Sequence, residues 1–290
     1  MKKYIFATLA LVCALACSPK KEEAPKVMAR AVPERADDFV FENDLIAGRF
    51  YGKALEGNPT SPGIDIWVKM PGRLVADEWY DHAVNEDPDY YHHDHGGKDC
   101  YKVAVSLGGG ASAPFIDGEL RYPATNYRSC EVLESTPQRV RFALEYPEWE
   151  ASDSLFVSLR KEVTLEAGSY FADVTDRYTF TGAEMIWVAA GMKLHDAQKT
   201  VEKAHRGLSR YAIWERASDQ SIEPEDGMIG VAVIAPSVDD RNIFVDFDLD
   251  HALLVGAVRS GQPFSYRFGS CWSKGDIRTA EEWFALVDGQ

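Results

Sequence analysis

The sequence predicts an all-β protein made of antiparallel strands. About a dozen segments are rich in β-branched and aromatic residues, and several of them alternate apolar with polar positions. Turn signals such as "EGNPTSPG", "GGGASAP" and "SGQP" separate these segments. So many antiparallel strands in one domain must stack or close, which favours a large sandwich or barrel.

The individual elements follow from the same patterns. Residues 276–287 predict a C-terminal helix, because an acidic first turn precedes Trp283, Phe284 and Val287 on one side. A short helix is also expected over 196–208. No repeat is visible, which disfavours a propeller or solenoid. The predicted strands are 65–70, 101–107, 128–136, 139–146, 155–165, 170–180, 185–194, 210–216, 229–236, 242–248, 251–258 and 264–272.

The first residues predict export and lipid anchoring. Two lysines precede the apolar run 4–16, which is too short to span a membrane, and the run ends in Ala-Leu-Ala before Cys17. Residues 1–17 therefore resemble a bacterial lipoprotein signal with Cys17 as the lipidated residue; a plain secretory signal is the alternative. Ser18 favours the outer membrane, on either its periplasmic or its surface side. We expect a flexible tether over 18–36 and one domain over 37–290.

The net charge and the cysteine count limit the binding partners and disulfides that we expect. A net charge of −15 disfavours nucleic acid and acidic membrane surfaces, so the lipid is the one membrane contact expected. Three cysteines remain after the signal, Cys100, Cys130 and Cys271, which allows at most one disulfide. The oligomeric state is not predicted.

The stretch "DYYHHDHGGKDCYK", residues 89–102, carries the most chemistry in the chain. Histidine titrates near neutrality and can act as a base, while tyrosine can protonate a leaving oxygen. In an extended segment, His92 and Asp94 would face one side and His93 and His95 the other. A divalent ion on His93 and His95 with Asp94 or Asp99 is the competing interpretation. Because no second ligand cluster or HExxH pattern supports it, no cofactor is predicted.

Several phrases together resemble domain-of-unknown-function family 4861. They are "GIDIWVKMP" (63–71), "DYYHHDHGGKDCYKVAVSLGGGASA" (89–113), "DGELRYPATNYRS" (117–129) and "HALLVGAVRSGQPFSYRFGSCWSKGDI" (251–277). The resemblance implies a secreted or lipid-anchored protein associated with polysaccharide use. It also implies an antiparallel β-supersandwich resembling galactose mutarotase. The chain departs from the family where Gly97 and Lys98 replace a turn that usually carries an acidic residue.

These observations predict a carbohydrate-active lipoprotein, in first place a lyase or dehydratase that performs β-elimination on oligosaccharides containing uronic acids. The predicted bases are His92 and His95, and the predicted acids are Tyr91 and Tyr101. The alternatives are a glycan-binding lipoprotein without activity and a sugar epimerase. The predicted substrate-binding residues are Trp79, Asn126, Arg128, Lys193, His195, Trp272 and Lys274.

The triplet Gly108–Gly110 does not match a phosphate-binding loop, because no clear helix follows it. It predicts a turn at which the backbone approaches a neighbour closely, either a glycan or an adjacent loop.

Overall fold

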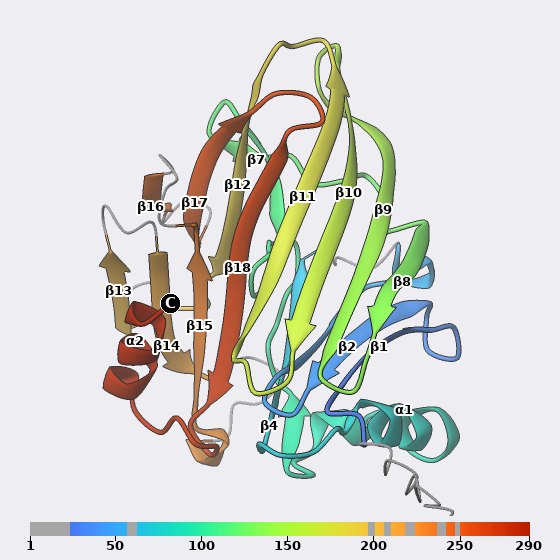
Figure 1. Cartoon of the computed structure of the whole chain (residues 1–290), viewed down its shortest axis with the longest axis vertical. Coiled ribbons are helices and arrows are strands. Elements are labelled where there is room, and N and C mark those ends of the chain that lie inside the picture. Colours follow the sequence, from blue (N-terminus) through green and yellow to red (C-terminus); the bar gives the residue numbers. More distant parts are fainter. Residues whose placement is uncertain are drawn as a thin grey trace, which may run out of the picture.

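The computed structural model describes residues 24–56, 63–196, 201–205, 210–217, 224–236, 242–246 and 250–290. The predicted signal and Cys17 lie outside these residues. The described strands form three sheets whose strands pair antiparallel, and a short helix follows the last strand (Figure 1). The predicted all-β, antiparallel class with a C-terminal helix is confirmed.

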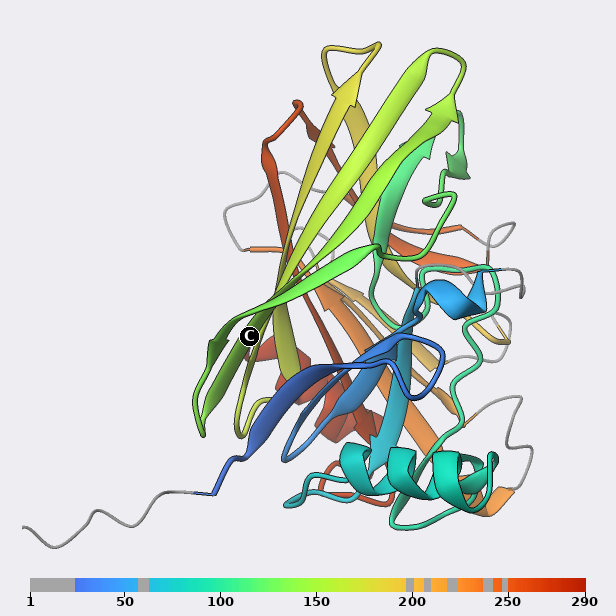
Figure 2. The same cartoon turned by 90° about the vertical axis from the view of Figure 1, so that its right-hand side faces the viewer.

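The N-terminal sheet contains five strands in chain order. β1 lies within the segment predicted as a tether, so that prediction is wrong for these residues: they pair along their full length with β2 and bury Val27 and Val32. Figure 2 shows this sheet beside the lower half of the largest sheet. Its strands are β1 (Val27–Val32), β2 (Asp38–Asn43), β3 (Ala47–Phe50), β4 (Ile64–Lys69) and β5 (Gly97–Asp99).

The largest sheet has eight strands, and its centre is the run of long hairpins seen in Figure 1. The helix predicted over 196–208 is wrong where the chain is described, because residues 201–205 pair with β14 as an edge strand. In sheet order the strands are β13 (Val201–His205), β14 (Arg210–Arg216), β15 (Met228–Ile234), β18 (Pro263–Trp272), β11 (Phe171–Thr181), β10 (Leu155–Glu166), β9 (Arg139–Ser152) and β8 (Ser129–Ser135).

The third sheet completes the sandwich. The predicted strand 101–107 is not formed; the chain there runs irregularly from β5 to β6. A Cβ added at Gly108 (φ 59°) would lie 2.2 Å from the Ile64 carbonyl oxygen, so the glycine run packs its backbone against β4. In sheet order the strands are β16 (Asn242–Asp246), β17 (His251–Val258), β12 (Ile186–Lys193), β6 (Ser112–Ile116) and β7 (Glu119–Leu120).

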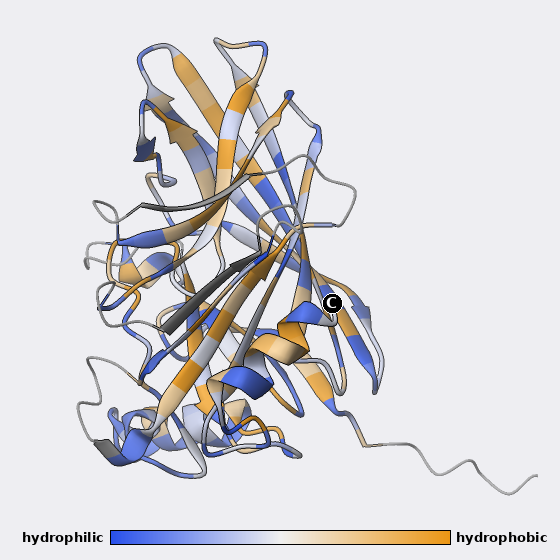
Figure 3. Cartoon of the chain, turned by 90° about the vertical axis from the view of Figure 1, so that its left-hand side faces the viewer, coloured by the Kyte–Doolittle hydropathy of each residue, from blue (hydrophilic) through white to orange (hydrophobic). Residues whose placement is uncertain are grey.

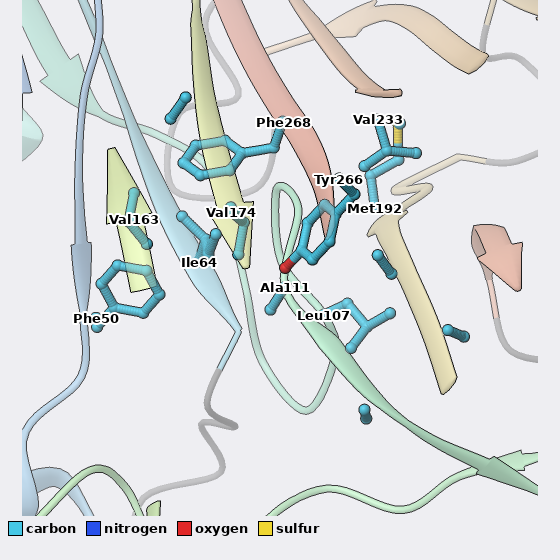
Figure 4. Close-up of a cluster of buried hydrophobic side chains, with 14 of the residues drawn as sticks. Phe50, Ile64, Leu107, Ala111, Val163, Val174, Met192, Val233, Tyr266 and Phe268 are labelled. Carbon is cyan, nitrogen blue, oxygen red and sulfur yellow. The ribbon is translucent and has the colours of Figure 1, made fainter. Parts of the chain in front are cut away.

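One hydrophobic core joins the three sheets. Figure 4 shows Ile64 of the N-terminal sheet, Phe268 of the large sheet and Met192 of the third converging in it. The rings of Phe39 and Phe142 lie 4.6 Å apart across the first two sheets. The alternation of hydrophobic and hydrophilic residues visible along the strands in Figure 3 directs one face of each strand into this core.

Two helices cover outer faces, α1 (Ala76–Asn85) on the N-terminal sheet and α2 (Ala280–Asp288) on the large sheet. α2 begins at a capping box on Thr279, three residues later than its predicted first turn. Among the described residues, no helix combines the length and apolar character needed to cross a membrane. Three 3-10 turns complete the secondary structure: η1 (Lys53–Leu55), η2 (Tyr90–His92) and η3 (Pro224–Asp226).

Candidate active site

Four neighbouring strands of the N-terminal sheet bring charged side chains to one end of the face that α1 and η2 cover. Arg49 on β3 stands directly opposite Asp65 on β4, and Asp99 on β5 pairs with Trp67 two positions further along β4. Side chains two positions apart point the same way, so Asp65, Trp67 and Asp99 share this face. Asp38 on β2 completes the set.

Arg49 is the centre of this group. Its Nε donates to Asp65 Oδ2 at 2.7 Å and its Nη2 to Asp99 Oδ2 at 2.7 Å, while Nη1 lies 3.5 Å from Asp38 Oδ2. The side chains of Arg49, Asp65 and Asp99 are no more than 4% exposed. Asp38 also pairs with Arg35 at 3.0 Å, so two guanidinium groups face three buried carboxyl groups, which leaves a local excess of negative charge.

Protonation of Asp65 relieves this excess of negative charge. Burial and the neighbouring charge of Asp99 raise the pKa of Asp65 to about 7, and the attraction of Arg49 only partly offsets them. The remaining oxygens, Oδ1 of Asp65 and Oδ1 of Asp99, are buried without a hydrogen-bond partner among the described residues. Buried polar atoms are normally bonded, so these two oxygens make the Arg49 group a candidate functional centre.

His92 connects the buried charges to solvent. Its Nε2 lies 3.5 Å from Asp99 Oδ2 and its Nδ1 lies 3.4 Å from Asp89 Oδ1. The imidazole is 28% exposed, whereas Asp99 behind it is 1% exposed and Asp89 in front of it is 75% exposed. The hydrogen bond to Asp99 is the main reason that the pKa of His92 is raised.

Aromatic rings surround Arg49. The guanidinium lies between 5.2 and 5.4 Å from the ring centres of Tyr51, Trp67 and Tyr91. The Tyr91 hydroxyl accepts from Arg35 Nε at 3.0 Å and from Nη2 at 2.7 Å, so two guanidinium groups contact this tyrosine. Burial, followed by the charge of Asp65, raises the pKa of Tyr51, which therefore keeps its proton.

The signature stretch folds differently from its expected extended form. Tyr90–His92 is a 3-10 turn, so the predicted alternation of the histidines is wrong. The turn directs His92 to Asp99. The ring of His95 stacks at 3.8 Å on Tyr90, whose other neighbour is His82 at 4.3 Å. His95 is therefore part of an aromatic stack away from the Arg49 group, and His93 is exposed.

Tyr101 and His195 come together in a second group, to which Lys193 contributes its backbone carbonyl. The Tyr101 hydroxyl donates to the backbone carbonyls of Gly108 and Lys193, which leaves it no proton for a substrate. His195 Nδ1 lies 2.7 Å from Glu215 Oε1, and Nε2 lies 2.8 Å from the Lys102 carbonyl oxygen. A carbonyl only accepts, so Nε2 carries a proton, and the predicted acid Tyr101 and the predicted ligand His195 serve structure instead.

The predicted sugar platforms are both buried. Trp79 is fully buried between α1 and the N-terminal sheet, and Trp272 is 3% exposed with its indole NH donating to the Asp226 carbonyl. Lys274 lies over the Trp272 ring at 4.8 Å and forms an ion pair with Asp94 at 2.8 Å. Neither tryptophan exposes a ring face to a sugar, because both rings are packed against neighbouring residues in the interior.

Asn126 and Arg128 act on the site indirectly. Asn126 Nδ2 donates to the Gly52 carbonyl at 2.8 Å, and Arg128 Nη2 donates to Glu56 Oε2 at 3.0 Å. Both therefore hold the segment that follows Tyr51. A direct substrate contact by either remains a prediction.

No group of three or more metal-binding side chains is found among the residues that the structure describes. The three cysteines Cys100, Cys130 and Cys271 are free thiols.

Sequence reasoning missed Arg49 and Tyr51, and it placed Asp65 only inside a strand and Asp99 only beside a possible ion. The usable signal was a single acid within the apolar run "GIDIWV" (63–68), since a lone aspartate in a buried strand needs a partner.

Comparisons with known proteins gave a curated relative, a solved structure and a family profile. An uncharacterized protein, P7, of Formosa agariphila is 31% identical over 251 residues, which cover 78% of this chain and 60% of that protein. The solved galactosidase domain of the α-galactosidase–sucrose kinase AgaSK aligns over 84% of this chain and 42% of its own, with 10% identity and a TM-score of 0.38. The profile described as a domain of unknown function, DUF4861, matches residues 16–290, and the chain belongs to this family.

Proposed function

We propose that the Arg49 group is the centre of a carbohydrate-active enzyme that performs β-elimination on oligosaccharides containing uronic acids. The observation that carries the proposal is the partly exposed His92 backed by the buried, Arg49-bound Asp99. A histidine with a carboxylate behind it and solvent in front is a suitable general base. The family resemblance supplies the carbohydrate class.

The reaction needs a base, an acid and a cation. His92 Nδ1, on the open side next to Asp89, takes the proton from the carbon beside the substrate carboxylate. The released electron pair forms a C=C bond to the next carbon, whose bond to the departing oxygen breaks. That oxygen receives a proton. Asp99 and Arg49 are positioning residues, since they act through His92.

Tyr51 is our proposed acid. It is 8% exposed, its raised pKa keeps it protonated, and its ring lies against Arg49. Its hydroxyl bonds the Asp65 side chain rather than a backbone carbonyl, so the protonated Asp65 can return the proton that Tyr51 gives up. Arg35, whose side chain is 25% exposed, can neutralise the substrate carboxylate as negative charge develops there. Tyr91, 2% exposed and bonded to Arg35, holds that guanidinium in place.

The test is the ultraviolet absorbance of the new C=C bond with a panel of oligouronides. We expect a signal from the wild-type protein, a loss of at least about a hundredfold in His92→Gln, and little change in His93→Gln, its exposed neighbour. A folded protein that gives no absorbance with any member of the panel would refute the proposal.

The same protein samples also distinguish β-elimination from the two alternative functions. A glycan-binding protein without activity was expected to use Trp79 and Trp272, which are both buried. A sugar epimerase could use the same base, but its product has no C=C bond and shows changed NMR signals at the inverted carbon.

We also propose that the protein is attached to the outer membrane through lipid on Cys17. Mass spectrometry of the N-terminal peptide from the bacterial membrane tests this, with Cys17→Ser expected to appear in the soluble fraction.

A further inference from the structure

A separate hollow of about 430 Å³ lies on the outer face of the large sheet, beside the C-terminal end of α2. Figure 1 shows α2 in front of β14 and β15, with the face of β18 and β11 uncovered next to it. The hollow lies at this boundary. Its volume suits a small molecule rather than a single ion.

The floor of the hollow is made of two cross-strand pairs. Asp173 stands opposite Arg267, and Thr175 stands opposite Ser265. Arg267 Nε lies 3.0 Å from Asp173 Oδ1, and its Nη1 donates to Gln290 Oε1 at 2.8 Å. These contacts fix the guanidinium plane. The Thr175 and Ser265 hydroxyls bond each other at 3.3 Å, so a ligand would bond the oxygens of this pair beside Nη2 of Arg267.

Two arginines and one aspartate line the hollow, in a chain of net charge −15. Arg210 is 5% exposed and donates to the backbone carbonyls of Val287, Asp288 and Gln290. It therefore supplies charge and holds the end of α2, while Arg267 is the cation available to a ligand.

One wall of the hollow is apolar. Ile234, Ala235 and Pro236 line it, and Pro236 is exposed. A ligand with hydroxyl groups on its edges, a carboxylate at one end and an apolar ring face meets all three parts of the lining. Acidic sugars have this combination of groups.

We propose that this hollow is a second, non-catalytic binding site for an acidic sugar residue. The sugar carboxylate pairs with Arg267, its hydroxyls bond Thr175 and Ser265, and its apolar face contacts Pro236. This role rests on the proposed function: the site would hold a polyuronide on the outer face of the sheet while another part of the same polyuronide reacts.

The experiment measures binding of trigalacturonate by calorimetry at low salt, in a His92→Gln background so that the probe is not consumed. Adding Arg267→Gln is expected to weaken binding at this site at least about tenfold, because a hydrogen bond between charged groups is lost. If the catalytic centre also binds trigalacturonate, the number of trigalacturonate molecules bound per protein is expected to be lower by one in the Arg267→Gln variant.

Arg160→Gln is the matched control. Arg160 is on the same outer face, one strand away on β10, and it pairs with Glu145 and Glu162 rather than lining the hollow. Ser265→Tyr, which fills the floor, gives an independent loss of binding. Thermal unfolding of each variant checks that it is folded.

The proposal is overturned when Arg267→Gln and Arg160→Gln bind trigalacturonate alike, or when neutral maltotriose binds as tightly as trigalacturonate. Failure of the proposed function is a separate result: the wild-type protein then forms no C=C product, whether or not the hollow binds sugar.

Discussion

Asp65 illustrates how burial changes the chemistry of one residue. It has Arg49 as a partner, but Arg49 is shared with Asp99 and Asp38, so the attraction does not compensate for the loss of water. The carboxyl group therefore keeps a proton to about pH 7. A group held in this state lowers the stability of the folded protein as pH rises, and such costs are typical of active sites.

Asp65→Asn tests this directly. Between its unfolded value of 3.8 and its folded value of about 7, Asp65 binds a proton only in the folded state, so wild-type stability falls as pH rises through this window. The amide still accepts from Arg49 but does not titrate. Urea unfolding at pH 5 and pH 8 should show a smaller decrease in the variant. An unchanged decrease would show that Asp65 is not the group responsible.

Asp99→Asn tests the role given to His92. Since the hydrogen bond to Asp99 is what chiefly raises the pKa of His92, removing the carboxylate charge lowers that pKa. The base then loses its proton at lower pH, so the acidic limb of the kcat/KM profile moves to lower pH while the plateau falls at least about tenfold. Asp89→Asn, at the exposed side, should move the limb less. An unmoved limb in Asp99→Asn would remove Asp99 from the mechanism.

At the scale of elements, α1 shows what sequence patterns cannot reveal. Val75 at its N-cap has no capping side chain; instead Glu42 of β2 accepts from the backbone N–H groups of Val75 and Ala76 at 2.7 and 2.8 Å. This cap comes from a residue far away in the sequence. No local cap marked the start of α1, and its acidic first turn, Asp77 and Glu78, did not suffice for a prediction.

Glu42→Ala should destabilise the protein strongly. The mutation removes the cap of α1 and also leaves Lys69, whose Nζ donates to Glu42 at 2.6 Å and which is fully buried, without its carboxylate. Breaking a buried ion pair costs about 3–5 kcal/mol. Glu78→Gln, which breaks the exposed pair with Arg73, should cost less than about 1 kcal/mol. Equal losses in urea unfolding would contradict the importance of the cap.

Long alternating strands were predictable because their pattern is local. β10, β11 and β14 lie at their expected positions to within about one residue, and β9 begins where expected but continues to Ser152. Each of them alternates buried and exposed residues or is buried along nearly its whole length. The irregular segment after β5 was mistaken for a strand. Tyr101, Val103 and Leu107 of this segment are buried while Lys102 and Val105 are exposed, and such alternation alone does not determine backbone conformation.

At the scale of the whole molecule, the candidate site is a product of topology. Asp38, Arg49, Asp65 and Asp99 come from four strands and meet only because those strands are neighbours in register. The signature stretch identified His92 and its surroundings, because those residues are close in sequence. Arg49 carries no local signal, since an arginine in a short strand is usually a surface residue.

The three sheets also meet at His195. The residue follows β12 of the third sheet, pairs with Glu215 on β14 of the large sheet, and contacts the Lys102 carbonyl just beyond β5 of the N-terminal sheet. Burial lowers its pKa, but Glu215 and the carbonyl outweigh this, so the folded pKa lies above the ordinary 6.5. The stabilisation is therefore complete below about pH 6.5 and is lost as pH rises through the folded value.

His195→Gln should consequently destabilise the protein more at pH 5.5 than at pH 8.5, as measured by urea unfolding. His93→Gln, at an exposed position in the signature loop, should change stability little at either pH. An equal loss at both pH values would mean that the imidazole contributes only packing. The expected difference would instead show that a proton on His195 holds the three sheets together, so stability should fall with rising pH in the same direction as the loss due to Asp65.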